Sequence, residues 1–389
     1  MCTILSHGLI AAGPGPRLRE AQAKHILNAH TNTHHQSPSH WFARAPILVW
    51  GGGAIGGTVA AFLARGWIPV TLVDIVAEHV EGSRTRGLQI EGPVAQFQQV
   101  VGAATPAELT GQFDCILLAV KAQHTAAAAE QLAPHLTATG VVVSLQNGLN
   151  ERQIAERIGA HRTIGACVNF AADYLEPGRI GFGNRGAIKI GEMSPGLSPR
   201  VQSLAELLQV FDTDTQAVAD VWGYKWSKLA YGSLLFATAL ANESMSETLA
   251  DPQHQALLAA LASEVTTIAL GTGVTPVGFD GFDPAAFSGE AGAPQAAVAL
   301  ANMADHYRRS SKQRSGVWRD LAVRKRKTEV DTQIAEIVRV AQAQGLQSPV
   351  TQILIRLIQE VEQGTRMIDR ANLLAFADEV AALPPRTSS

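Results

Sequence analysis

The stretch that decides the fold is 47-ILVWGGGAIGGTVAAFLARGWIPVTLVD-74. Its pattern predicts an apolar strand, a glycine turn, a helix and a second strand. The continuous apolar run at 47–50 is typical of a strand buried on both faces of a parallel sheet. The glycines of Gly51-x-Gly53-x-x-Gly56 permit a tight turn, close approach of the backbone to a ligand, and close packing of helix on strand. Around this βαβ unit we expect an α/β fold with a doubly wound sheet.

This arrangement predicts a dinucleotide site, since a pyrophosphate would lie at the positive N-terminal end of the helix. The alternative is a purely structural βαβ unit. Asp74 ends the second strand 23 positions after the first glycine, close to the spacing at which an acid binds an adenosine ribose. Its charge disfavours a 2′-phosphate, and no Arg or Lys occurs between it and Arg84. The sequence therefore favours NADH, with NADPH as the alternative. The cofactor-binding residues expected here are Gly51, Gly52, Gly53, Ala54, Ile55, Gly56 and Asp74.

The bulk composition is that of a small-molecule enzyme rather than a nucleic-acid-binding or membrane protein. The 389 residues suggest two domains, and a formal charge of −3 indicates neither a nucleic-acid partner nor an anionic membrane surface. The three cysteines are too few and scattered for a disulfide framework or a metal site, which favours a reducing cytoplasm. Residues 1–45 hold six of the twelve histidines, and their composition suggests a flexible extension. For these histidines, solvent exposure is favoured over a metal-binding arm, and a transit peptide is a weaker alternative.

Two further polar residues follow buried strands of the predicted sheet. Lys121 comes after the apolar run at 113–120, and Asn147 follows the run at 141–145. Ligands of doubly wound sheets bind outside the carboxyl ends of the strands, so we expect both residues beside the glycine turn. Taken singly, Lys121 could be merely solvated and Asn147 part of an Asn-Gly turn. Segments at 162–170, 179–182 and 187–190 are expected to complete the sheet.

Beyond about residue 220 strand patterns largely vanish and a helical domain is expected. Its first helix, near 224–242, places Lys228, Gly232 and Phe236 on one face, because they are spaced by four residues. A lysine beside a largely apolar run favours a catalytic or ligand-binding role over a lysine whose stem packs on the surface. The basic run at 324–327 is interpreted as a solvated face, and Thr328-x-x-Asp331 as a capping-box start that puts Glu329 in a first helical turn.

Together these stretches resemble the 2-dehydropantoate 2-reductase (ketopantoate reductase) family. The resemblance implies a Rossmann sheet followed by an all-helical domain, as in 6-phosphogluconate-dehydrogenase-like folds, with the active site between them. It implies that Lys228 is the general acid that protonates the substrate carbonyl. It also implies that Lys121 and Asn147 contact cofactor and substrate, and that Glu329 contacts the cofactor. The matching stretches are GGGAIGG at 51–57, LLAVKAQ at 117–123, SLQNGLN at 144–150, PGRI at 177–180, KWSKLA at 225–230, RDLAVRKRKTEVD at 319–331 and SPVTQ at 348–352.

The chain departs from the family in its expected substrate pocket. Where the family has asparagines four and eight residues after the lysine, this chain has Gly232 and Phe236. A serine expected before Asp320 aligns with Gly316, next to Ser315. Loss of these partners disfavours a substrate whose hydroxyls need them, so the identity of the oxo acid stays open.

The sequence thus predicts reversible hydride transfer between NAD(P)H and a 2-oxo acid, either ketopantoate or a related acid. One alternative is an NAD-dependent dehydrogenase of another hydroxy acid or sugar acid, and the other is a non-catalytic NAD(H)-binding sensor. The expected domains are an extension at 1–45, a Rossmann domain at 46–220 and a substrate or dimerisation domain at 221–384. The expected partner is a small 2-oxo or 2-hydroxy acid. No metal, nucleic acid or membrane is expected, and a homodimer is left open.

Overall fold

The computed structural model describes residues 46–288, 293–310 and 312–384. The extension expected at 1–45 lies outside these residues, and so do its histidines.

The opening stretch forms the predicted strand–helix–strand unit. β1 (Ile47–Trp50), α2 (Ala54–Arg65) and β2 (Val70–Val73) follow one another, and all four residues of β1 are buried. β1 and β2 are parallel, with Ile47 beside Val70. β1 is central in the sheet because β6 (Phe113–Leu118) pairs with it, also in parallel, on its other side. The first half of the fold prediction is confirmed.

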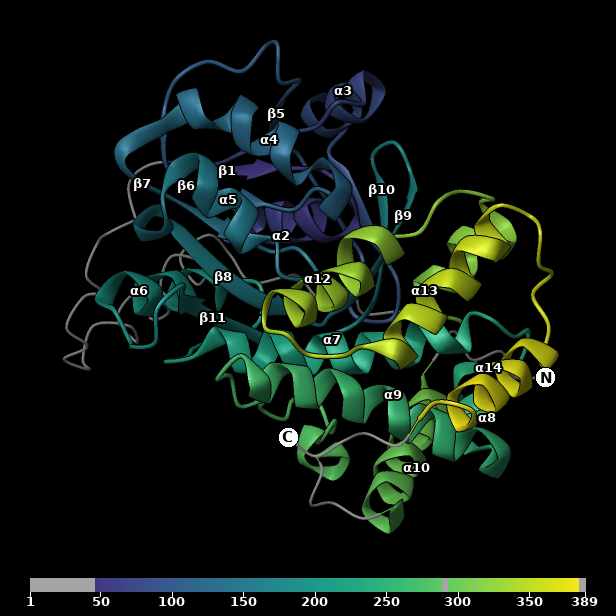
Figure 1. Cartoon of the computed structure of the whole chain (residues 1–389). Helices are drawn as coiled ribbons and strands as arrows, with labels where there is room; N and C mark the ends of the chain where they lie inside the picture. The colour runs from purple at the N-terminus through teal and green to yellow at the C-terminus, as the bar shows by residue number, and fades with distance from the viewer. Residues whose placement is uncertain (1–45, 289–292, 311, 385–389) are drawn as a thin grey trace, which may run out of the picture. The chain divides into compact units, whose positions relative to one another are not determined.

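The main sheet has eight strands, and both of its faces are covered by helices (Figure 1). Only the pairing of β11 with β8 is antiparallel. One face packs against α2 and α6 (Pro199–Leu208), and the other against α4 (Thr125–Leu132) and α5 (Glu151–Ile158). A further helix, α3 (Ala77–Thr85), follows β2. In spatial order the strands are β12 (Gln216–Ala217), β11 (Ile188–Glu192), β8 (Thr163–Val168), β7 (Leu136–Ser144), β6, β1, β2 and β5 (Gly102–Ala104).

The prediction that residues 179–182 complete this sheet is wrong. β10 (Arg179–Asn184) instead belongs to a second sheet, in the order β4 (Phe97–Gln99), β3 (Leu88–Glu91), β10, β9 (Ala171–Glu176). The chain turns back at Gly178 into an antiparallel pair with β9, and buried Ile180 then packs against Gly57 of α2. The apolar pattern of β10 is therefore explained by packing on the helix rather than by a place in the main sheet.

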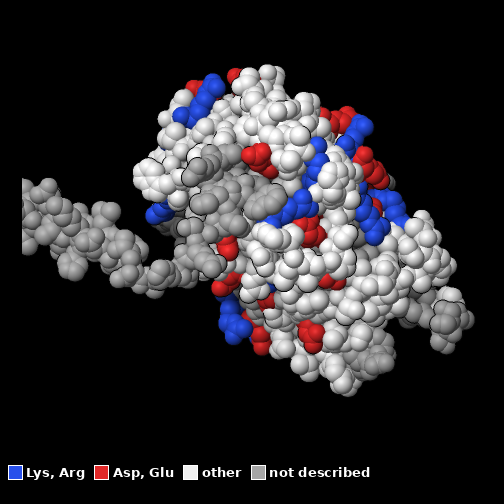
Figure 2. Space-filling model, turned by 90° about the vertical axis from the view of Figure 1, so that its left-hand side faces the viewer, with Lys and Arg blue, Asp and Glu red and all other residues white. Residues whose placement is uncertain are grey.

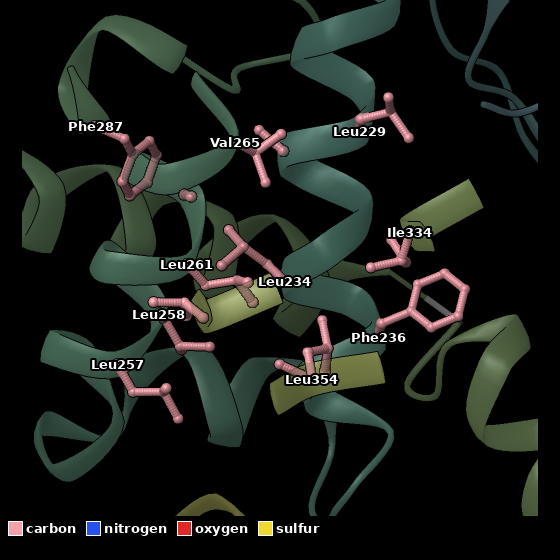
Figure 3. Close-up of a cluster of buried hydrophobic side chains, with 14 of the residues drawn as sticks. Leu229, Leu234, Phe236, Leu257, Leu258, Leu261, Val265, Phe287, Ile334 and Leu354 are labelled. Carbon is pink, nitrogen blue, oxygen red and sulfur yellow. The ribbon is translucent and has the colours of Figure 1, made fainter. Parts of the chain in front are cut away.

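The second half of the chain is helical from α7 (Val221–Thr238) onward, as predicted. α7 lies in the centre of its core, and Figure 3 shows Leu234 and Phe236 leaving this helix on different sides, with Phe236 beside Ile334. The remaining helices are α8 (Met245–Ala250), α9 (Pro252–Gly271), α10 (Ala293–Arg309), the short α11 (Gly316–Trp318), α12 (Ala335–Ala343), α13 (Pro349–Glu362) and α14 (Ala371–Ala381).

The capping-box interpretation of Thr328-x-x-Asp331 is wrong. A π-helical turn (Val330–Ile334) precedes α12, so the helix does not begin at Thr328. The Thr328 hydroxyl donates to Glu362 Oε1 at 2.6 Å and accepts from the amide of Val330 at 3.1 Å. The local bond to the Val330 amide is thus kept, but Glu362, 34 residues away, takes the acceptor role that the capping box assigns to Asp331, because its Oε1 also accepts from the Thr328 amide at 2.7 Å. Sequence spacing alone does not reveal this partner.

Among the described helices none is long and apolar enough to cross a bilayer. Cys115 and Cys167 are buried free thiols, and burial raises the pKa of both.

Candidate active site

A cavity of about 1500 Å³ lies between the carboxyl ends of the central strands and the helical half. The sequence-predicted residues Asp74, Lys121, Asn147, Lys228 and Glu329 all line it. So do Gly51, Gly53, Ala54, Ile55, Gly232, Phe236, Ser315 and Gly316. Gly52 and Gly56, in contrast, are not among the residues that line the cavity. Residues predicted from four distant parts of the sequence therefore share one cavity.

The glycine turn has the geometry of a dinucleotide-binding loop. Gly51 has a φ of 104°, which L side chains rarely adopt. A Cβ on Gly56 would lie 2.0 Å from the Gly51 carbonyl oxygen, so the close packing of α2 on β1 requires glycine there. A Cβ on Gly53 would meet no atom within 4 Å, so this residue faces open space at the start of α2. The N-terminal amides of α2 are therefore accessible to an anionic group.

Asp74 is joined to the glycine turn by its carboxylate. Asp74 Oδ2 accepts a hydrogen bond from the Gly52 amide at 2.7 Å, and Oδ1 accepts one from the Val76 amide at 2.9 Å. These bonds hold the carboxylate at the end of β2, beside the turn. A carboxylate oxygen has lone pairs for more than one donor, so this position can also accept a ribose hydroxyl.

His79 supports the turn from behind, and no sequence pattern indicated this role. The ring is fully buried, and its Nδ1 accepts a hydrogen bond from the Gly178 amide at 2.9 Å. Burial lowers the pKa of His79, although the nearby charge of Asp74 opposes the shift. A neutral imidazole therefore joins the cofactor turn to the β9–β10 hairpin.

Lys121 connects the sheet to the helical half. Its Nζ lies 3.1 Å from Asp320 Oδ2 and 3.9 Å from Glu329 Oε2. Glu329 Oε1 also accepts a hydrogen bond from the Ala122 amide at 3.1 Å. Lys121 and Glu329, which are more than 200 positions apart in the sequence, thus meet at the cavity.

The basic run at 324–327 has a role beyond that of a solvated face. The face in Figure 2 shows basic and acidic side chains beside each other. Arg324 and Arg326 are exposed, but both line the cavity and both pair with Asp320 Oδ1 at 2.9 Å. Burial would raise the pKa of Asp320, yet the Arg324 hydrogen bond and the Lys121 charge hold this pKa below its usual value. A charged cluster therefore borders the cavity.

Lys228 extends from α7 into the cavity and meets Asn147 there. Its Nζ donates to Asn147 Oδ1 at 2.6 Å and also to the Val168 carbonyl. The pKa of Lys228 is lowered to about 8, mainly by burial and also by the nearby charge of Lys225, and Cys167, Asp280 and Glu329 oppose this shift only in part. An ammonium whose pKa lies near neutrality can both give up and take back a proton, which is what a general acid and base needs.

Lys225, one turn before Lys228, fixes the helix to the sheet. Its Nζ forms a fully buried ion pair with Glu151 Oε1 at 2.5 Å. The same Nζ donates to the carbonyls of Gln146 and Ala166, each at 3.3 Å. Removal of one partner of such a buried pair costs about 3–5 kcal/mol of folding free energy. The pair therefore fixes α7, which carries Lys228, against the sheet.

The residues at the positions of the family's two asparagines and its serine have different surroundings in this chain. Phe236 is 3% exposed and packs in the helical core beside Ile334 (Figure 3). Ser315 is buried, and its hydroxyl accepts a hydrogen bond from the Trp318 amide at 3.1 Å. Gly232 and Gly316 face empty space, because a Cβ on either would meet no atom within 4 Å.

Among the cavity-lining side chains that sequence reasoning missed are Tyr231, Asp280 and Lys312. The hydroxyl of Tyr231 bonds to that of Tyr307 on α10. Asp280 Oδ2 accepts from Asn169 Nδ2 at 2.7 Å. Burial lowers the pKa of Lys312. Asp280 and Lys312 lie on loops without periodicity, and only the helical spacing after Lys228 could have indicated Tyr231.

A Rossmann sheet with this glycine turn and terminal acid, facing a desolvated lysine of a helical domain across one cavity, defines an NAD(P)-dependent oxidoreductase. The family model described as ketopantoate reductase PanE/ApbA matches residues 47–195, and its C-terminal counterpart matches residues 220–362. The chain belongs to this ketopantoate reductase family.

The names of similar proteins agree with this assignment. The chain is 32% identical to the 2-dehydropantoate 2-reductase of Mesorhizobium japonicum over 259 residues, which is 60% of this chain and 79% of the relative. It is 30% identical to the enzyme of the same name from Pyrococcus horikoshii over 230 residues, which is 59% and 74% of the two chains.

Solved structures show the same fold. A PanE/ApbA-family ketopantoate reductase from Ralstonia eutropha superposes with a TM-score of 0.68 at 24% identity, covering 82% of this chain and 99% of the other. D-mandelate dehydrogenase with NADH and anilino(oxo)acetate superposes with a TM-score of 0.72 at 18% identity, covering 82% and 98%. At these identities the likeness is one of fold alone.

Proposed function

We propose that the chain catalyses reversible hydride transfer between a nicotinamide dinucleotide and a 2-oxo acid, with Lys228 as the general acid. The observation that carries the proposal is the Lys228 Nζ, held 2.6 Å from Asn147 Oδ1 in the cavity that also contains the glycine turn. The names of the relatives, 2-dehydropantoate 2-reductases, support a 2-oxo acid as substrate.

The residues present fit a nicotinamide dinucleotide. Gly53 leaves open space before the first amides of α2, where a pyrophosphate fits, and Asp74 lies at the end of β2 for a ribose. Lys121, Asn147 and Glu329 line the same cavity and are proposed to contact cofactor or substrate. When bound, the reduced nicotinamide supplies the hydride that the substrate carbonyl carbon accepts.

The chain's own residues handle the proton and the charge. As negative charge develops on the carbonyl oxygen, the Lys228 ammonium stabilises it and donates a proton from Nζ. The Asn147 amide oxygen and the Val168 carbonyl accept from the same Nζ and so orient it. Lys312 lines the cavity with a partly desolvated ammonium and is proposed to attract the substrate carboxylate.

For the cofactor we propose NADH over NADPH, and Asp74 is the reason. Its carboxylate lies beside the glycine turn, where it would repel a 2′-phosphate. D-mandelate dehydrogenase, which shares the fold, was solved with NADH. The homodimer and the reducing cytoplasm expected from the sequence stay predictions.

The test is a screen of NADH and NADPH oxidation by the purified chain against a panel of 2-oxo acids that includes 2-dehydropantoate. We expect oxidation with at least one acid and a higher kcat/KM for NADH than for NADPH. NADH binding without oxidation by any acid would instead favour the non-catalytic sensor. Reduction of NAD with a panel of hydroxy acids and sugar acids tests the remaining alternative, which is an NAD-dependent dehydrogenase of another hydroxy acid or sugar acid.

A further inference from the structure

One stripe of α7 forms the cavity wall beyond Lys228. Tyr231 and Gly232 stand one turn further along the helix, and Leu235 and Phe236 stand two turns further. Each of them lines the cavity, because residues three and four positions apart share a helix face. The cavity therefore continues along α7 away from the proton donor.

Apolar side chains surround the far end of this stripe. Met245 at the start of α8 and Met303 on α10 line the cavity there, and both are buried. α10 and α8 lie close to each other in Figure 1. With Leu235 and Phe236 they define what we name the far pocket: Leu235, Phe236, Met245 and Met303. No member of this pocket carries a side-chain hydrogen-bond donor.

Two polar side chains that line the cavity beside this stripe, Tyr231 and Ser315, already have partners, whereas Asn302 and His306 of α10 also line the cavity but are exposed. The hydroxyl of Tyr231 bonds to that of Tyr307, which joins α7 to α10. The Ser315 hydroxyl accepts the bond from the Trp318 amide. The four side chains of the far pocket offer a substrate hydroxyl no donor and no strong acceptor, so a hydroxyl placed among them would lose its bonds to water without an equivalent replacement, which is unfavourable.

Two glycines enlarge the space between Lys228 and the far pocket. A Cβ on Gly232 or on Gly316 would meet no atom within 4 Å, and both residues line the cavity. The two glycines come from different elements, α7 and α11, so space is left on two sides. The whole cavity has a volume of about 1500 Å³, whereas roughly 300–1,000 Å³ is usual for a small-ligand site. It therefore has room for a dinucleotide together with an acid that carries a bulky substituent.

We propose that the far pocket selects 2-oxo acids with a bulky apolar substituent, such as a phenyl ring or a branched alkyl chain, over acids with a hydroxylated chain. The proposal rests on the proposed function, since it requires the reacting carbonyl at Lys228. With the carbonyl there, the substituent extends along α7 past Gly232 and packs against Leu235 and Met303. An extra apolar group in such a pocket is worth roughly 10–200-fold in kcat/KM, and this sets the scale of the expected preference.

The experiment compares kcat/KM for phenylglyoxylate, 4-methyl-2-oxopentanoate and 2-dehydropantoate at saturating NADH. We expect the two apolar acids to exceed 2-dehydropantoate by about tenfold or more. Gly232→Asn fills the space beside the far pocket and is expected to cut kcat/KM for phenylglyoxylate about tenfold or more, with a smaller effect on 2-dehydropantoate. Gly316→Ser is a second variant, which adds a smaller side chain to the cavity wall from α11 rather than from α7.

Gly345→Asn is the matched control, because Gly345 is exposed after α12 with a φ of 68°, a conformation that Asn tolerates. It should leave all three kcat/KM values unchanged. A thermal melt and an NADH fluorescence titration show whether each variant is folded and binds cofactor.

The outcomes separate the two proposals. If no acid oxidises NADH or NADPH, the proposed function is wrong. If 2-dehydropantoate is reduced and has the highest kcat/KM, the function stands and the far-pocket proposal is overturned. The same conclusion follows if the apolar acids are preferred but folded Gly232→Asn and Gly316→Ser variants leave the preference unchanged.

Discussion

The two ends of the cavity use glycine for opposite purposes. At the cofactor end, a Cβ on Gly56 would lie 2.0 Å from the Gly51 carbonyl oxygen, so absence of a side chain lets two backbones touch. At the substrate end, Gly232 and Gly316 have no atom within 4 Å of a built Cβ, so absence of a side chain leaves a void. Glycine therefore marks tight packing of helix on strand at Gly56, whereas at Gly232 and Gly316, and at Gly53 where the cofactor turn faces the cavity, it leaves vacant space.

This difference explains why the cofactor end of the cavity is easier to predict from the sequence than the substrate end. Close backbone contact imposes a fixed spacing of glycines next to a strand, and that spacing is visible in 51–56. A void imposes no pattern, so Gly232 and Gly316 attract notice only by comparison with a family that has side chains there. The predictions below test each end separately.

The largest effect is expected at the residue between the two ends. Lys228→Ala should lower kcat by about 10²–10⁴-fold, because it removes the positioned proton donor, while NADH affinity stays nearly unchanged. Steady-state kinetics and a fluorescence titration with NADH measure the two quantities. A variant that retains most of its turnover would remove Lys228 from the mechanism.

The pH dependence should follow the lowered pKa of Lys228. Reduction needs the protonated amine, so kcat/KM for the oxo acid should be level below about pH 8 and fall about tenfold per pH unit above it. Oxidation of the hydroxy acid needs the neutral amine, so its kcat/KM should rise with pH up to about pH 8 and be level above it. The profiles of both directions should share this inflection, and an inflection near pH 10 would mean that the amine is not desolvated.

Gly56→Ala tests the tight end. The added methyl group collides with the Gly51 carbonyl, and overpacking of this kind costs roughly 1–3 kcal/mol. We expect lower stability in urea unfolding and weaker NADH binding. Unchanged NADH affinity would contradict the close helix–strand contact.

Asp74→Ala tests the cofactor preference. Loss of the carboxylate removes both its charged hydrogen bonds and its repulsion of a 2′-phosphate, so the NADH/NADPH ratio of kcat/KM should fall by about tenfold. Glu78→Ala removes an exposed acid on the neighbouring helix and should leave the ratio as it is. An unaltered ratio in Asp74→Ala would exclude the ribose contact.

Gly232→Ala tests the open end and should have the smallest effect. Gly232 lies inside α7 with empty space beside it, so alanine should stabilise the protein by about 0.4–1 kcal/mol, mainly by restricting the unfolded chain. Urea unfolding measures this gain. A loss of stability would show that the space beside α7 is not vacant.

Local patterns predicted the first half of the fold well, and they also brought Lys121 and Asn147 to the edge of the sheet where both line the cavity. The strand–turn–helix of 47–65 and the residues at strand ends, Lys121 and Asn147, follow from periodicity and sheet topology. Contacts between distant segments were not accessible in the same way. The ion pairs of Asp320 with Arg324 and Arg326 depend on a π-helical turn (Arg319–Val323), and the pattern of charges alone indicated only a solvated face.

The second sheet and the start of α12 illustrate the same limit. β10 has an apolar alternation that suits either sheet, and its packing against α2 decides between them. Thr328 carries the residue type of a helix cap and accepts from the Val330 amide, but Glu362 of another helix, and not Asp331, accepts from its backbone amide. Both predictions were overturned by tertiary partners.

The buried ion pair of Lys225 and Glu151 limits how the two halves of this enzyme can be recombined with those of other proteins. The two family models divide the chain between residues 195 and 220, yet the Lys225 ammonium pairs with an acid of the first half, where both groups are shielded from water. A chimera that joins this N-terminal half to the C-terminal half of another protein must therefore carry a matching cation at the position of Lys225. Without it, a carboxylate stays uncompensated at the junction, at a cost of about 3–5 kcal/mol. The usable cutting point for recombination consequently lies after the first two turns of α7 rather than in the preceding linker.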